Sequence, residues 1–284
     1  MSPFALALAA GLTSALNVFA SKLLVGKGLR LLVVGGWVHL LGSLVCCLGL
    51  PFVEVRLSLE PLVLLSLLGM MAVYTLGNAL YFSAPASTPL SEIDFFLRTS
   101  SLWTFLGGAL LLLEPLGPKS LVGAALILAS ASVFSLWQQS GALRFTGPQL
   151  LALGGALAFG AGNLVDKTLS PHFDALSYTL LNQLLTGLGM LGAARVSFRE
   201  LRSPQFWGRG AGLVALTFAL TQLLLILAYQ AGGGAGQVIL LAQARLIILV
   251  PVGVFVLGER ERLGCKVLAS VLMIMGILVL YGSR

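Results

Sequence analysis

The chain has 284 residues, of which 58% are hydrophobic and only 10% are charged, and its formal net charge is +7. Water-soluble domains carry roughly a quarter charged residues, so this composition excludes a soluble globular protein and indicates a membrane protein. The basic residues stand in short loops between apolar stretches, which is typical of topology signals at a membrane surface rather than of nucleic-acid binding.

A helix that crosses a bilayer needs about twenty mainly apolar residues, and the first half of the chain contains five such stretches. They are Pro3–Leu24, Leu31–Pro51, Pro61–Ser83, Ser91–Leu113 and Ser120–Gln138. The start of the first stretch lacks the basic segment of a signal peptide, so we interpret it as a transmembrane helix that is retained.

The second half contains five further stretches of the same kind. They are Pro148–Leu169, Ala175–Ala194, Gly208–Gln230, Gln237–Leu257 and Gly264–Tyr281. Shifting the sequence on itself by 145 positions aligns Pro3 with Pro148, Lys22 with Lys167 and Glu114 with Glu259. The chain therefore reads as a duplication of one five-span unit.

Because each unit holds an odd number of spans, the second unit must enter the bilayer from the opposite face. The predicted fold is an all-α integral membrane protein with ten transmembrane helices in a 5+5 inverted-topology repeat. Residues 1–142 and 143–284 form the two units of one membrane domain. Inverted repeats of this kind are typical of secondary transporters.

Small residues recur every fourth position in spans one and six, at Ala7, Gly11 and Ala15 and at Ala152, Ala156 and Gly160. In lipid, small residues at this spacing let two helix backbones approach closely. Alanine-rich helices also show such spacings by chance, but the stripe occurs in both halves. We expect these faces to be packed against other helices.

Several short motifs recur in order in the two halves. The second half has Asn163 and Lys167, Ala228-Tyr229, Pro251, Leu257-Gly258-Glu259-Arg260, and Gly276-Ile277-Leu278; the first has Asn17 and Lys22, Ala79-Leu80-Tyr81, and Leu113-Glu114. This pattern resembles the EamA-type units of the drug/metabolite transporter superfamily over the whole chain. The first half departs from it by having Pro115 where an arginine is usual and by lacking the proline of span nine. The resemblance implies transport of a small metabolite by alternating access, with spans one, three, four, six, eight and nine lining a central cavity.

Two arginines, Arg98 and Arg245, lie seven to eight residues inside spans four and nine. A charge at this depth is costly and usually faces a cavity or a partner, so we predict that both bind an anionic group of the substrate, most readily a carboxylate or phosphate. Two alternatives remain open. Asp94 stands one helical turn before Arg98 and can neutralise it, and Arg245 can extend its side chain to the interface.

Further candidate substrate-binding residues are Asn17, Asn163, Asn78, Tyr81, Tyr229 and Trp103. The alternative for each polar group is a hydrogen bond between helices, and for Trp103 it is packing between helices. His39 is predicted to be a hydrogen-bonded core residue. Glu114 and Glu259 are predicted to be structural caps or gate elements.

No catalytic residues, metal ligands or cofactor are predicted, because the chain has only two histidines and no Ser/His/Asp set or metal spacing. Span one contains no acid, unlike the four-span proton/drug antiporters of the same superfamily. A coupled proton, which we do not expect, would have to bind Glu92, Asp94 or Asp166.

The expected function is secondary transport, as an exporter, of a small metabolite such as an amino acid or another carboxylate-bearing solute. A lipid flippase and a non-transporting scaffold are the alternatives. The expected partners are a small-molecule substrate and membrane lipid, without nucleic acid, for a monomer or homodimer. In the cell membrane, the count of loop Lys and Arg favours termini outside, whereas the family resemblance implies cytoplasmic termini.

Overall fold

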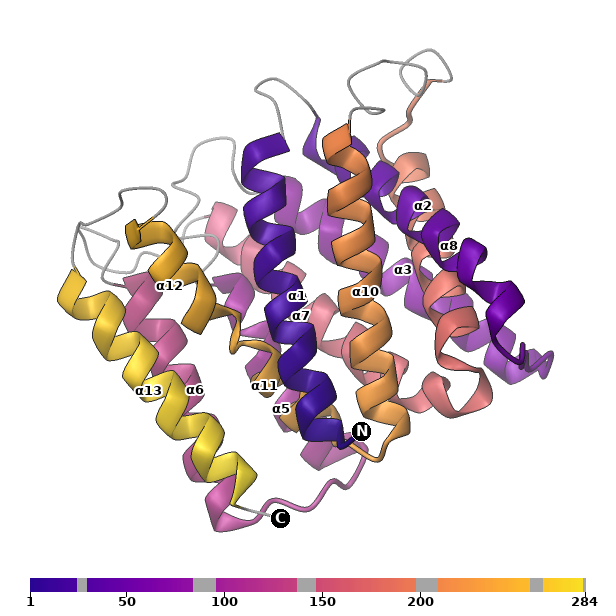
Figure 1. The fold of residues 1–284 in the computed structure, drawn as a ribbon. Helices are drawn as coiled ribbons and strands as arrows, with labels where there is room; N and C mark the ends of the chain where they lie inside the picture. The colour runs from indigo at the N-terminus through magenta and orange to yellow at the C-terminus, as the bar shows by residue number, and fades with distance from the viewer. Residues whose placement is uncertain (25–29, 84–95, 137–146, 198–208, 256–262, 283–284) are drawn as a thin grey trace.

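The computed structural model describes residues 1–24, 30–83, 96–136, 147–197, 209–255 and 263–282, and these are folded into helices and their connections (Figure 1). The helices are α1 (Pro3–Leu24), α2 (Leu31–Gly49), α3 (Pro61–Ser83), α5 (Ser100–Leu111), α6 (Pro118–Leu136), α7 (Gly147–Leu169), α8 (Ala175–Ala193), α10 (Arg209–Gln230), α11 (Ala235–Ala242), α12 (Arg245–Phe255) and α13 (Leu263–Tyr281). Short 3-10 turns, η1 (Leu50–Phe52) and η3 (Ser170–His172), follow α2 and α7. Every predicted span is represented by a helix or by a pair of helices.

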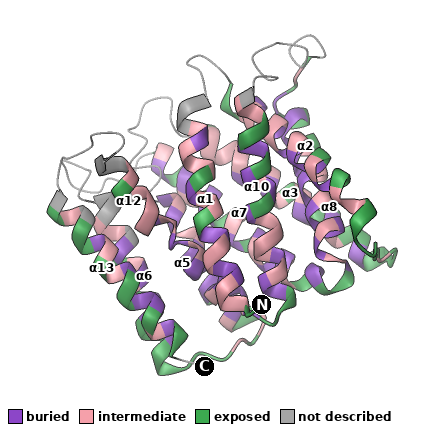
Figure 2. Cartoon of the chain, in the orientation of Figure 1, coloured by how far each residue is buried: buried purple, intermediate pink, exposed green. Residues whose placement is uncertain are grey.

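The outer surface of the bundle carries large apolar side chains. Leu48, Leu62 and Leu110 are each at least 70% exposed, and exposed positions follow the outer faces of the helices in Figure 2. Such a surface is unfavourable in water and suits lipid, where helices also satisfy their own backbone hydrogen bonds. Five of the described helices, starting with Pro3–Ser21, are long and apolar enough to cross a membrane. The chain is a multi-pass membrane protein.

The packing of the helices repeats between the two halves. The contact of α1 with α10 is repeated by the contact of α7 with α3. In the same way, the contact of α1 with α11 is repeated by that of α7 with α5, and the contact of α2 with α10 by that of α8 with α3. The remaining large interfaces, α2–α8, α6–α13 and α5–α11, each join a helix to its own counterpart. This is the pattern expected when two like units are related by a twofold axis between them.

The two units run in opposite directions. Pro3, at the start of α1, packs beside Gly233 just after α10, and Lys167, near the end of α7, donates a hydrogen bond to the carbonyl of Tyr229 at the end of α10. The start of α1 therefore lies on the face where its counterpart α7 ends, and both chain termini lie on that face (Figure 1). The predicted boundary between the units, at residues 142 and 143, falls outside the described residues.

The small-residue stripes of α1 and α7 are buried in equivalent contacts. A Cβ on Gly11 would lie 2.8 Å from the carbonyl oxygen of Ala242, on α11, and one on Gly160 would lie 2.7 Å from Cβ of Trp103, on α5. Ala7, Ala152 and Ala156 have no exposed surface. Close backbone approach, rather than burial of large side chains, thus holds each first helix against the fourth span of the other unit.

The structure differs from the prediction in spans four and nine, which are interrupted instead of continuous. In span four residues 96–98 are helical and a turn at Thr99 precedes α5; in span nine Gln243 and Ala244 separate α11 from α12. The N–H groups of Thr99, Gln243 and Ala244 bond to carbonyls three residues earlier, not four, which tightens the helix. The repeat shift aligns Thr99 with Ala244, so both units are broken at the same position.

Candidate functional site

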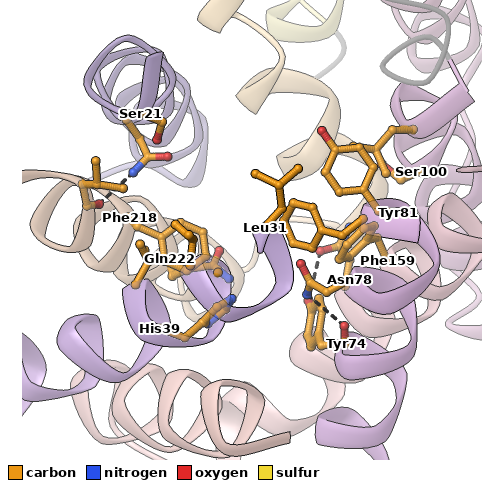
Figure 3. A pocket seen from close by; sticks show the side chains of 18 of the residues that line it. Ser21, Leu31, His39, Tyr74, Asn78, Tyr81, Ser100, Phe159, Phe218 and Gln222 are labelled. Carbon is orange, nitrogen blue, oxygen red and sulfur yellow. Dashed lines mark hydrogen bonds between the residues drawn. The ribbon is translucent and has the colours of Figure 1, made fainter. Parts of the chain in front are cut away.

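A cavity of about 530 Å³ lies between the two units and extends from the middle of the bundle towards the face where α1 ends. Its wall reaches that face at Ser21, near the end of α1, and at Leu31, the first residue of α2. Figure 3 shows Phe218 and Gln222 of α10 with His39 of α2 on one side of the cavity, and side chains of α3 and α7 on the other. The helix pairs that repeat between the units thus form opposing walls.

Both predicted anion-binding residues line this cavity, and both stand at the helix interruptions. Arg98 directly precedes the turn at Thr99, and Arg245 is the first residue of α12. Nη1 of Arg245 lies 3.4 Å from Oγ of Ser14 on α1, and the carbonyl of Arg98 accepts a hydrogen bond from Ser101 at 2.8 Å. Asp94, the alternative partner of Arg98, lies outside the described residues.

The charged side chains in the described part of the cavity wall have one sign. Among the described residues of the wall, the charged side chains are Arg98 and Arg245, and no aspartate or glutamate faces the cavity. Arg98 is only 9% exposed, so the electrostatic attraction for an anion is weakly screened by water there. The arrangement can hold an anionic group more strongly than a neutral or cationic one.

The predicted amides line the cavity and also join helices. Asn17 donates to the carbonyl of Val214 at 2.8 Å and to Thr217 at 3.0 Å on α10, and Asn163 donates to Thr104 on α5 at 3.0 Å. Asn78 donates to the carbonyl of Tyr74 within α3. These bonds fix the orientation of amide groups that border the cavity together with Tyr81. An amide that forms a hydrogen bond within the bundle can therefore still face a substrate in the cavity, so the two predictions for these residues are compatible.

Two predicted site residues lie away from this cavity. Tyr229 is 2% exposed; its carbonyl accepts from Lys167, and its ring centroid is 5.8 Å from the Lys167 ammonium. Trp103 packs against Gly160 of α7, in agreement with the alternative prediction that it packs between helices. The physical reason is helix rotation: the position of a residue along its span does not give the direction in which its side chain points.

Several polar residues of the cavity wall were not predicted as site residues. His39 is buried, as predicted for a core residue, and it also lines the cavity, with its ring 4.7 Å from that of Phe218 in an edge-to-face contact. Asn182 of α8 and Gln243 at the interruption of span nine also line it. Asn182 and Gln243 are polar residues in the middle of apolar spans, and this signal could have identified them.

Polar contacts join the two units at the opposite end of the bundle. Leu113 adopts a left-handed backbone with φ of 53°, and the N–H of Glu114 bonds to the carbonyl of Gly108, which turns Glu114 back across the end of α5. The Glu114 carboxylate accepts a 2.6 Å hydrogen bond from the N–H of Ala235 at the start of α11. A negative charge at this end of a helix is favourable. Glu114 is the predicted cap, whereas Glu259 lies outside the described residues.

Comparison with known proteins identifies a family and a shared fold. Residues 1–136 match the model of the EamA-like transporter family. No curated protein matches the chain in sequence. A protein of known crystal structure superposes with a TM-score of 0.70 and 20% sequence identity over 98% of this chain and 94% of that one. At this identity the likeness shows the fold alone.

Proposed function

We propose that this chain, whose residues 1–136 match the EamA-like transporter family of the drug/metabolite transporter superfamily, is a secondary transporter of a small solute that bears a carboxylate. The solute binds in the cavity between the two units and crosses by alternating access. The predicted direction, export, stays a prediction.

The main support for the proposal is the positive charge on the described part of the cavity wall. Arg98 and Arg245 bring two positive charges to a space whose described wall contains no acid. A guanidinium binds a carboxylate through two parallel hydrogen bonds. One arginine comes from each unit, so an anion between them is held from both sides of the twofold axis.

The rest of the wall suits an apolar body attached to that anionic group. Phe82, Phe159 and Phe218 contribute aromatic surface, and Val34, Val38 and Leu97 contribute aliphatic surface. An amino acid is accommodated through its carboxylate, but on the described wall its ammonium group finds amide and hydroxyl oxygens rather than a carboxylate. We therefore expect an anion to bind more tightly than the corresponding zwitterion.

Alternating access follows from the one-sided arrangement. The cavity extends towards the face where α1 ends, while the other end is held by Glu114 on the start of α11 and by Lys167 on the carbonyl of Tyr229. Exchange of the two pseudo-equivalent units about their axis produces a state with the opposite face open. The interruptions at Thr99 and at Gln243–Ala244 are where spans four and nine can bend.

Four ligands built on one skeleton test the charge preference. N-acetylphenylalanine is an anion, phenylalanine a zwitterion, N-acetylphenylalanine amide neutral and phenylalanine amide a cation. Calorimetric binding to the purified protein is expected to be tightest for the anion. Arg245→Gln removes a charge-assisted interaction of about 1.5–3 kcal/mol, which weakens anion binding about 10- to 150-fold.

The control is Lys119→Gln, which removes a positive charge from an exposed side chain bonded to the carbonyl of Gly282, and it should leave binding unchanged. Equal affinity for all four ligands, or tighter binding of the cation, would reject the proposed anion site. Preference for a phospholipid over all four would favour the flippase alternative.

A further inference from the structure

A buried acidic group, Asp166 of α7, lies beside the cavity. Its carboxylate is 3% exposed and accepts three hydrogen bonds: from the hydroxyl of Tyr74 at 2.6 Å, the hydroxyl of Tyr178 at 2.7 Å and the amide of Asn182 at 2.9 Å. All three donors are neutral. Among the described residues no basic side chain pairs with it, so its negative charge is not neutralised locally.

The hydrogen bonds around Tyr74 already fit two protonation states of this carboxyl group. The Tyr74 hydroxyl lies 2.6 Å from Oδ2 of Asp166 and 3.3 Å from Oδ1 of Asn163, but it has one proton to donate. With Asp166 ionised, Tyr74 donates to it. With Asp166 protonated, the new O–H donates to Tyr74, whose own proton turns to Asn163. No donor is lost in either state.

The same chain of bonds connects Asp166 to the cavity. Tyr74, Asn163 and Asn182 each border the cavity, and Figure 3 shows Tyr74 at its edge with its hydrogen bond to Asn163. Asn163 donates to Thr104 at 3.0 Å, and Thr104 donates to the carbonyl of Ser100 at 2.9 Å. The bonds thus reach the interruption of span four, where Arg98 stands.

The other titratable groups around Asp166 do not replace it as a proton acceptor. Tyr74 on α3, Tyr178 on α8 and Tyr229 on α10 lie within its electrostatic range, and all three are neutral phenols at physiological pH. Lys167, the next residue on α7, directs its ammonium to the carbonyl of Tyr229. A buried carboxylate is costly when ionised, and the three donors offset part of that cost.

We propose that Asp166 is a proton-binding site that exchanges with the cavity and couples solute movement to a proton. A proton from cavity water forms the O–H bond of the carboxyl group, and its release returns the proton to water. The coupling rests on the proposed function: an anion held by the two arginines adds negative charge near Asp166, which favours the protonated form. Solute and proton therefore bind together, and the protein is a symporter of the two.

By linkage, the affinity for the anion must then rise as the pH falls. Typical coupling between two sites changes affinity about 5- to 150-fold, so we expect N-acetylphenylalanine to bind at least about 5-fold more tightly when Asp166 is protonated. Neutral N-acetylphenylalanine amide should show no such dependence. A carboxylate that only ties α3, α7 and α8 together would give neither effect.

The site itself is tested without any ligand. Infrared difference spectra of the full chain in lipid vesicles, between neutral and acidic pH, should contain the C=O band of a buried protonated carboxyl group. Asp166→Asn should remove this band, and Tyr178→Phe, which keeps the acid but removes one donor, should shift it. Asp174→Asn, an acid outside the spans, should keep it. A spectrum of Asp166→Asn identical to that of the unmodified protein overturns the proton site.

The coupling is tested by the pH dependence of binding. If N-acetylphenylalanine binds and the dependence is the same in Asp166→Asn, coupling is overturned while the proposed function stands. If the band titrates but none of the four ligands binds, the proton site stands and the proposed substrate class fails. Loss of the pH dependence in Asp166→Asn, with binding retained, supports both.

Discussion

Glu114→Gln tests whether a charge at the start of α11 keeps one face of the protein shut. The carboxylate accepts the Ala235 N–H at 2.6 Å, and it fits there only because two neighbours are glycines: a Cβ on Gly108 or Gly234 would lie 2.6 Å or 2.9 Å from its Oε2. Glutamine has the same shape and keeps an acceptor oxygen. The substitution therefore removes the charge and little else.

The size of the effect follows from two contributions. A hydrogen bond to an ionised acceptor is about twice as strong as a neutral one, a difference of about 1 kcal/mol. The charge at the helix terminus adds about 0.3–1 kcal/mol. Losing both destabilises the closed arrangement by about 1–2 kcal/mol, which raises the fraction open at this face about 5- to 30-fold.

A cysteine at Ala235 reports the opening, because this residue has no exposed surface while the face is closed. In protein whose three native cysteines are replaced by serine, the rate of labelling by a charged maleimide should rise about 5- to 30-fold with Glu114→Gln. Glu60→Gln, at an exposed acid that precedes α3, is the matched control. An unchanged labelling rate would refute the assignment of Glu114 as the closing contact.

Two further predictions concern stability. Gly11→Ala should lower the melting temperature, because the new Cβ would lie 2.8 Å from a backbone oxygen and overpacking costs about 1–3 kcal/mol. The control is Gly69→Ala, whose Cβ would have nothing within 4 Å and should not lower it. Equal melting temperatures of the two variants would contradict the close contact at Gly11. Asp174→Ala should remove the cap of α8, where the carboxylate accepts from the Ser177 N–H at 2.9 Å, at a cost of about 1 kcal/mol. Burial raises the pKa of the Asp174 carboxyl, but its hydrogen bonds to Ser177 and to backbone N–H groups outweigh this and hold the pKa below the ordinary value. The stabilisation is therefore complete above the ordinary pKa and lost as the pH falls through the lowered one, so unfolding titrations should show a difference at neutral pH that disappears in acid.

The fold was largely predictable from the sequence because a lipid bilayer admits few kinds of spanning structure. Apolar length alone predicted α1 and α3 with the bounds that the structure gives them, since a bilayer requires continuous helices of about twenty residues. The alignment of Pro3 and Lys22 with Pro148 and Lys167 indicated the duplication. The interruptions of spans four and nine were not predictable, because alanine and glutamine are good helix formers and tertiary packing decides where the turns tighten.

The site was predictable in part. Arg98 and Arg245 stood out because charges are rare in apolar spans, and both line the cavity. The hydrogen bonds around Asp166 could not be predicted from the sequence, because Tyr74 and Tyr178 lie 92 and 12 residues away from it along the chain. Only the packing of α3 against both α7 and α8 brings these hydroxyls to the carboxylate.

The most direct test of the central claim is counterflow in vesicles that contain the purified protein. Vesicles preloaded with unlabelled N-acetylphenylalanine should accumulate the labelled anion above the level of protein-free vesicles. Arg245→Gln should abolish the accumulation, while Lys119→Gln should leave it intact. Accumulation equal to that of protein-free vesicles, or the same accumulation in Arg245→Gln as in the unmodified protein, would contradict transport of an anion held by this arginine.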